Sequence, residues 1–196
     1  MADSLFLSLW FPSFGRAEMM PRISCVLRQF PFSAQRPGVS YLAVHPVSWN
    51  EPTILERRML GAAPQQAVEA AADLLHEDYA YLFEAFWDLW TPQSQTNRWA
   101  AEARGVKFIV HGTEFDEGSF EHNGHIQVDF GLDTPFFYED VQLTPAAEER
   151  VKANVQKLVA FTASVEKNCL PRGRVLWSES EDNLAQKLIA RLQQVQ

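Results

Sequence analysis

Apolar and polar side chains alternate along residues 106–115 and again along residues 120–130, on either side of a turn-like segment. Successive side chains of a β-strand point to opposite faces, so this alternation predicts two strands of a hairpin, each with one apolar face. The apolar positions that define this face are Val106, Phe108, Val110, Ile126, Val128 and Phe130.

The register of this hairpin follows from the same pattern. A shift of the register by one residue would turn the apolar side chains of one strand to the face opposite those of the other strand, so the register must keep both apolar sets on the same face. The register that does so leaves residues 117–119 as a three-residue loop, in which Gly118 can adopt a positive φ. The cross-strand pairs predicted on the polar face are Lys107–Asp129, Ile109–Gln127 and His111–His125.

Other stretches predict further elements on both sides of the hairpin. Apolar residues recur at spacings of three, four and seven along residues 61–90, which favours one long helix; a strand over residues 79–90 is the alternative, but strict alternation is lacking there. Further strands are predicted at 4–11, 39–49, 53–59 and 175–178, and further helices at 17–29, at 94–103, from Thr144 to about 169, and after Ser178.

This order of elements predicts an α+β fold, in which a layered antiparallel sheet carries its helices on one face. Residues 1–196 are interpreted as a single domain, because no linker-like or low-complexity segment divides them. The order also suggests a pseudo-duplication into two ferredoxin-like halves, near residues 1–91 and 92–196. No residue-level repeat accompanies the suggested halves.

The net charge of −8 and the lack of a Lys/Arg-dense run argue against nucleic acid and anionic membranes as partners. No apolar run reaches 18 residues, so no transmembrane helix is expected, and the N-terminus lacks the pattern of a signal peptide. A soluble, cytoplasmic protein is the resulting expectation. Cys25 and Cys169 lie too far apart in the sequence to indicate a disulfide framework, and Cys25 is expected to be a buried, inert thiol.

The polar face of the hairpin is the candidate ligand-binding face, formed by Lys107, His111, His125 and Asp129. Histidine beside a carboxylate is suited to acid–base catalysis and to metal binding, so His111 and His125 are weak candidates for metal ligands. The spacing of the two histidines matches no known metal-binding motif. The alternative interpretation is that these polar residues simply form the solvent-exposed face of an antiparallel sheet and make up no binding site. No cofactor is predicted, because phosphate-binding loops, dinucleotide motifs and nucleophile elbows are absent from the sequence.

The sequence leaves three functions open. No residues are spaced as in a known catalytic motif, and the chain contains six tryptophans and 14 phenylalanines. Both observations favour a non-catalytic binding or interaction protein that binds a protein partner or forms a homodimer. The alternative is an enzyme or metal-binding protein that uses the face around His111 and His125. A third, weaker hypothesis is a small-molecule binder with a Trp-lined cavity.

Overall fold

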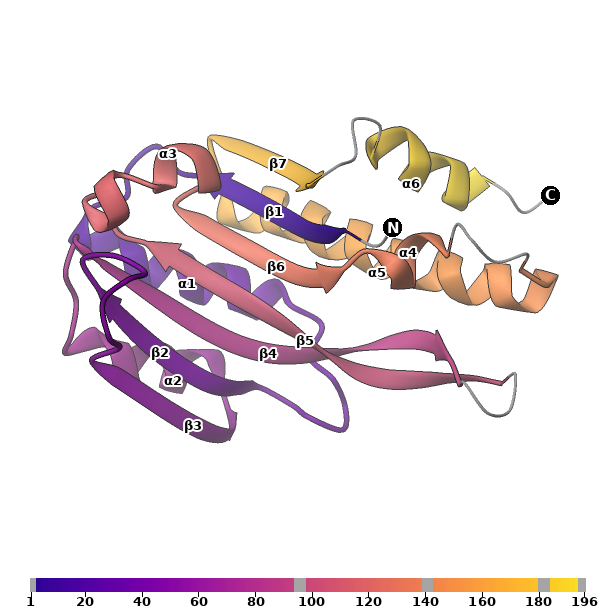
Figure 1. Ribbon diagram of the computed structural model, residues 1–196, viewed down its shortest axis with the longest axis horizontal. Helices are drawn as coiled ribbons and strands as arrows, with labels where there is room; N and C mark the ends of the chain where they lie inside the picture. Colours follow the sequence, from indigo (N-terminus) through magenta and orange to yellow (C-terminus); the bar gives the residue numbers. More distant parts are fainter. Residues whose placement is uncertain (1–2, 94–97, 139–142, 180–183, 194–196) are drawn as a thin grey trace.

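A computed structural model of the chain describes residues 3–93, 98–138, 143–179 and 184–193. Its seven strands form one antiparallel sheet in the order β3-β2-β4-β5-β6-β1-β7 (Figure 1). The strands are β1 (Ser4–Trp10), β2 (Val39–Pro46), β3 (Leu55–Ala62), β4 (Tyr79–Pro92), β5 (Trp99–His111), β6 (Ile126–Leu132) and β7 (Gly173–Ser178). The helices are α1 (Arg16–Gln29), α2 (Pro64–Ala72), α3 (Phe120–Asn123), α4 (Thr134–Phe137), α5 (Pro145–Cys169) and α6 (Leu184–Gln193), and a 3-10 turn spans Phe115–Glu117.

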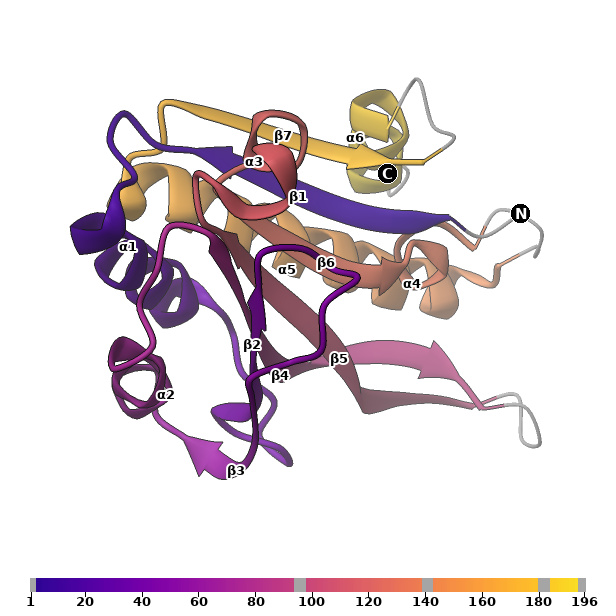
Figure 2. The ribbon, with the colours of Figure 1, turned by 60° about the vertical axis from the view of Figure 1, so that its left-hand side comes forward.

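The helices α1, α2 and α5 lie on one face of the sheet, which confirms the predicted layered α+β architecture (Figures 1 and 2). The core between the two layers contains the inward side chains of the strands, such as Leu7, Phe83 and Phe108, packed against Ile23 of α1 and Leu158 of α5. The strand order does not confirm two ferredoxin-like halves, because β1 is inserted between β6 and β7. Among the described residues, no helix is long and apolar enough to cross a membrane.

The long helix predicted over residues 61–90 is wrong beyond its first part. The helix α2 ends at Ala72, and residues 79–92 form β4 instead. Every second residue of β4 from Tyr81 to Leu89 is buried in the core, but Leu82, Phe86 and Trp90 are apolar on the other face, which hides the alternation. Pairing with β5 along 13 residue pairs decides in favour of the strand, because tertiary contacts override a helix-like spacing.

Two further predictions around β5 are also wrong. Residues 99–103 belong to β5 rather than to a helix, and residues 94–97 of that predicted helix lie outside the described part of the chain. The link from β5 to β6 is longer than a three-residue loop, because it contains the 3-10 turn and α3, so the second strand begins at Ile126 rather than at 120. The predicted register is nevertheless confirmed, with Lys107 opposite Asp129 and Ile109 opposite Gln127.

The ends of β4 and β5 project beyond their neighbours as a two-stranded arm, visible at the right of Figure 1. This β4–β5 arm comprises Phe86–Pro92 and Trp99–Gly105; β2 pairs with β4 only as far as Ala85, and β6 pairs with β5 only from Lys107 onward. Asn154 of α5 holds the arm in place. Its side chain accepts from the Trp90 amide at 2.8 Å and donates to the Trp90 carbonyl at 2.9 Å and to the Pro135 carbonyl at 2.8 Å.

Replacing Asn154 by alanine is expected to lower the free energy of unfolding by about 2 kcal/mol, because it leaves backbone groups of the arm without partners at a buried position. Asn154 is only 1% exposed, so water cannot easily take its place. Chemical denaturation checks the value. Lys152→Ala on the same helix is the control, and an equal loss for both variants would contradict the role assigned to Asn154.

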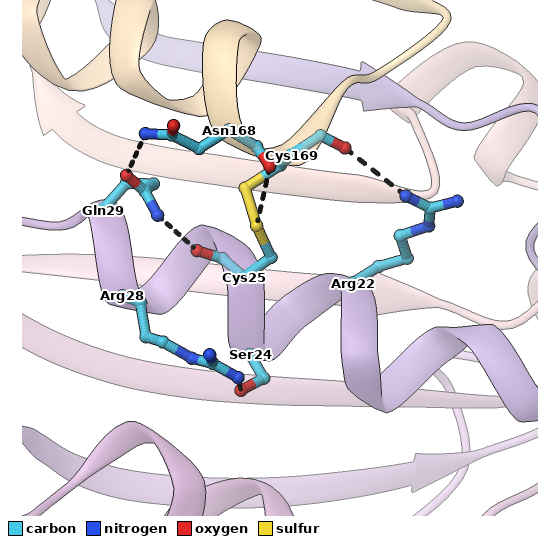
Figure 3. The surroundings of a disulfide bond; sticks show 7 residues. All are labelled: Arg22, Ser24, Cys25, Arg28, Gln29, Asn168 and Cys169. Atoms are coloured by element: carbon cyan, nitrogen blue, oxygen red, sulfur yellow. Dashed lines mark hydrogen bonds between the residues drawn. A yellow bond between two sulfur atoms is a disulfide. The ribbon is translucent and has the colours of Figure 1, made fainter.

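Cys25 of α1 and Cys169 at the end of α5 form a disulfide, with their Cα atoms 5.8 Å apart (Figure 3). The prediction of a buried, inert thiol at Cys25 is therefore wrong. The two cysteines are 144 residues apart in the sequence, but the packing of α1 against α5 brings them together. Hydrogen bonds from Asn168 to the Gln29 side chain at 2.7 Å and from Arg22 to the Cys169 carbonyl at 3.4 Å reinforce the same junction.

Candidate functional site

The face of the sheet opposite the long helices is here called the open face (Figure 1). Lys107 and Asp129 point to this face, because their neighbours Phe108 and Val128 are buried in the core on the other side of the sheet. Strand pairing aligns one residue from each strand into a continuous row across this face. In strand order, this central row consists of Arg58, Tyr41, Glu84, Lys107, Asp129, Phe6 and Trp177.

The charged members of the central row alternate in sign, in the order Arg58, Glu84, Lys107 and Asp129, with Tyr41 between the first two. Lys107 is exposed, whereas Glu84 and Asp129 are half-buried. Asp129 also accepts a hydrogen bond from the Gly131 amide at 2.8 Å, which fixes its carboxylate beside the backbone. Glu84, Lys107 and Asp129 border a hollow of about 160 Å³ together with Gly105 and Gly131.

Apolar side chains flank these charges on the open face. Phe6 and Trp177 stack with ring centroids 4.6 Å apart, and the Trp177 indole donates to the Ser8 hydroxyl at 3.0 Å. Leu82 and Ile109 are paired neighbours on β4 and β5 and remain half-buried, since none of the described helices covers them. The open face therefore combines charged side chains with partly exposed apolar side chains.

His111 occupies a buried position at the end of β5, with 1% of its surface exposed. Its Nδ1 lies 2.9 Å from the Gly124 carbonyl oxygen, and because a carbonyl only accepts, Nδ1 carries the proton in this contact. The rings of Trp49 and Phe115 pack around the imidazole. Desolvation by this burial lowers the pKa of His111 to about 4, so the ring is neutral at pH 7.

His125 precedes β6 and is stacked between two phenylalanine rings, Phe14 at 4.4 Å and Phe120 at 4.7 Å between centroids. Its Nδ1 accepts from the Phe11 amide at 2.9 Å, so a neutral His125 carries its proton on Nε2. Burial lowers the pKa of His125 to about 4 as well. His125 is linked to the other histidine through the backbone, since the His111 amide donates to the His125 carbonyl at 2.9 Å.

The structure thus brings the four predicted residues onto one face but in two separate groups. Lys107 and Asp129 lie in the central row, whereas His111 and His125 lie about 13 Å further along their strands, at four residues of strand rise. Both Nδ1 atoms are engaged in hydrogen bonds within the fold. In the described part of the chain, no three side chains of His, Cys, Asp or Glu are grouped to hold a metal ion.

Several residues of the open face could not be recognised from the sequence. The apolar spacing of residues 61–90 predicts a helix at Glu84, and Phe6, Tyr41 and Trp177 are far from the hairpin in the chain. Only the strand order places them beside Lys107 and Asp129. No protein-family model matches the chain, and no curated protein or solved structure is significantly similar to it. We therefore infer function from the geometry of the open face.

Proposed function

We propose that this chain is a non-catalytic interaction protein that forms a homodimer through its open face. The observation that carries the proposal is the alternation of charge along the central row. A row of alternating charges is complementary to a second copy of itself when each charged strand of one copy lies opposite the neighbouring strand of the other copy, so that β4 faces β5. A face of a single charge sign would repel its own copy instead.

A twofold axis parallel to the strands and midway between β4 and β5 produces this offset. It sets Glu84 opposite Lys107 of the partner subunit, and Lys107 opposite Glu84 of the partner subunit. The same operation brings Tyr41 toward the partner's Asp129 carboxylate. It also brings Arg58 toward the partner's Phe6 ring, where a guanidinium on an aromatic face is favourable.

The apolar residues of the open face fit the same arrangement. The axis preserves position along the strands, so Leu82 packs against the partner's Ile109, and Ile109 against the partner's Leu82. Sheets that pack face to face lie about 10 Å apart, a distance that aliphatic side chains fill and that Glu and Lys side chains can span together. Burial of this area supplies the affinity, and the charges determine the alignment of the two sheets.

The cellular location is part of the same proposal. The sequence favours the cytoplasm, but the Cys25–Cys169 disulfide weighs against a reducing compartment, because structural disulfides persist mainly where the environment is oxidising. We propose that the dimer functions in an oxidising compartment. Mass spectrometry of the protein isolated from its native cells under thiol-blocking conditions tests this, and two alkylated cysteines would contradict it.

Replacing Lys107 by glutamate is expected to convert the dimer to a monomer, because it places two carboxylates opposite each other at both symmetric contacts. Sedimentation velocity at micromolar concentrations measures the result, and the wild-type chain should sediment with twice its chain mass. Lys167→Glu, an exposed position on α5 away from the open face, is the charge-matched control and should remain dimeric. A wild-type chain that stays monomeric, or a dimeric Lys107→Glu variant, would contradict the proposal.

A further inference from the structure

The sheet opens between β5 and β6 at a pair of glycines. Lys107 and Asp129 are the last aligned pair, and beyond them Gly105 and Gly131 follow without pairing. The register between β1 and β6 also shifts here by one residue, and Gly131 has a φ of 74°, as expected for a β-bulge with glycine at the left-handed position. Bulges of this kind are frequent beside binding sites, because they end the pairing of strands locally.

A hollow of about 380 Å³ lies at this opening, on the side of the sheet that faces α4 and α5. This volume falls in the range of small-molecule sites. Its walls come from the β4–β5 arm, the end of β6 and the segment of α4, and most of them are apolar. The residues that line it include Leu89, Arg104, Phe130, Leu132, Pro135 and Tyr138.

The polar groups of this hollow are few and are placed at its rim. Arg104 pairs with Glu102 at 3.0 Å, but the two side chains are 49% and 41% exposed, and Arg104 can exchange a solvated ion pair of this kind for a pair with another anion. Desolvation raises the pKa of Tyr138, so its phenol stays protonated and can donate a hydrogen bond. Leu132 is 57% exposed at the same rim, an apolar surface without cover in the described structure.

The hollow is held open by a fixed frame. Asn154 ties the Trp90 backbone of the arm to the Pro135 carbonyl of α4, so two walls are joined through one buried side chain. Trp87 stacks on Phe130 with centroids 5.3 Å apart, and it lies opposite Arg104 in the β4–β5 pairing. These contacts make the hollow preformed, which reduces the ordering cost of binding.

We propose that this hollow binds a small amphipathic carboxylate, such as a medium-chain fatty acid. Arg104 receives the carboxylate, because its planar guanidinium can form two parallel hydrogen bonds with the two oxygens. The Tyr138 hydroxyl donates a further hydrogen bond to the same group. The apolar tail lies against Leu89, Phe130, Leu132 and Pro135. This site is on the opposite side of the sheet from the central row, so it goes beyond the proposed dimer and does not depend on it.

The test is isothermal titration of the full chain with octanoate, with octan-1-ol and octylammonium as probes of the same chain length. Octanoate should bind saturably, and the two other probes should bind about tenfold or more weakly, because each lacks the anionic group. Arg104→Gln should weaken the binding of octanoate by a similar factor. Leu132→Trp should abolish octanoate binding, because the larger side chain fills the hollow from an exposed position. Arg58→Gln, at the far edge of the sheet, is the matched control and should bind octanoate as the wild type does.

Three outcomes would overturn the proposal: no saturable binding of octanoate, equal binding of octanoate and octan-1-ol, or equal octanoate affinity in the wild type and Arg104→Gln. Circular dichroism of each variant shows that the fold is retained, and Arg104 is exposed enough for its replacement to be tolerated. Titration of Lys107→Glu separates the two proposals. It should bind octanoate whether or not it dimerises.

Discussion

Replacing Cys25 and Cys169 by alanine together is expected to lower the free energy of unfolding by about 5 kcal/mol. The disulfide closes a loop with a sequence separation of 144 residues, and the chain entropy that such a cross-link removes from the unfolded state grows with the logarithm of loop length. A loss of this size is comparable to the whole stability of many domains. Chemical denaturation under non-reducing conditions measures it.

The matched control for this prediction is the wild-type chain in reducing buffer, which should lose a similar amount of stability. The double alanine variant itself should be insensitive to the reductant, because it has no bond left to reduce. A difference of less than 1 kcal/mol between the oxidised wild type and the variant would contradict the stabilising role assigned to the bond between α1 and α5.

The stability of the fold is expected to fall as the pH decreases from 6.5 to 4. His111 has a pKa of about 4 in the folded chain and an ordinary pKa near 6.5 when unfolded, so in this range the unfolded state binds one more proton than the folded state. The stabilisation of the fold by neutral His111 is fully present above pH 6.5 and is lost between pH 6.5 and 4. Below pH 4, His111 causes no further change in the free energy of unfolding. The shift corresponds to about 3 kcal/mol, and His125, whose pKa is also about 4, adds to the loss.

His111→Asn isolates this effect from the titration of carboxylates. The asparagine amide can donate to the Gly124 carbonyl in place of Nδ1 but does not titrate. The slope of the free energy of unfolding against pH between 6.5 and 4 should therefore decrease by the equivalent of about one bound proton. Denaturant midpoints measured at half-unit pH intervals provide the comparison. Identical slopes for the two proteins would mean that His111 is not held neutral by the fold.

The register of the β5–β6 pair could be predicted from the sequence because it depends on a local pattern. Val110 and Ile126 are apolar on the buried face, and any slip would expose them, so the pairing of Lys107 with Asp129 follows. The link between the two strands could not be predicted in the same way. Phe115 packs against Trp49, and the Phe120 carbonyl accepts a hydrogen bond from the Trp10 indole at 3.0 Å, so contacts with distant residues determine a longer connection than the strands require.

The strand β4 was missed because its open face is as apolar as its buried face at several positions. Leu82, Phe86 and Trp90 interrupt the alternation that would have identified a strand. In the proposed dimer, Leu82 packs against a second subunit, so the residue that interrupts the alternation is one of the proposed interface residues. Phe86 has a different reason, since the Arg36 guanidinium lies 3.5 Å above its ring.

The disulfide and the hollow at Gly105 and Gly131 depend on the arrangement of elements in space, which residue patterns do not define. Cys25 and Cys169 become neighbours only through the packing of α1 on α5. The hollow exists because two strands diverge, and the glycines at the opening resemble ordinary turn residues in the sequence. The charged row is also the product of strand order, and it is the part of the structure on which the proposed function rests.

A mixing experiment tests the proposed dimer most directly. Glu84→Lys and Lys107→Glu are prepared as separate proteins, and each is expected to be monomeric by sedimentation velocity, because like charges meet at both contacts. When the two are mixed in equal amounts, both contacts regain opposite charges, so we expect a one-to-one heterodimer with the sedimentation coefficient of the wild-type dimer. A mixture that remains monomeric, or either variant dimerising alone as the wild type does, would contradict association through the open face.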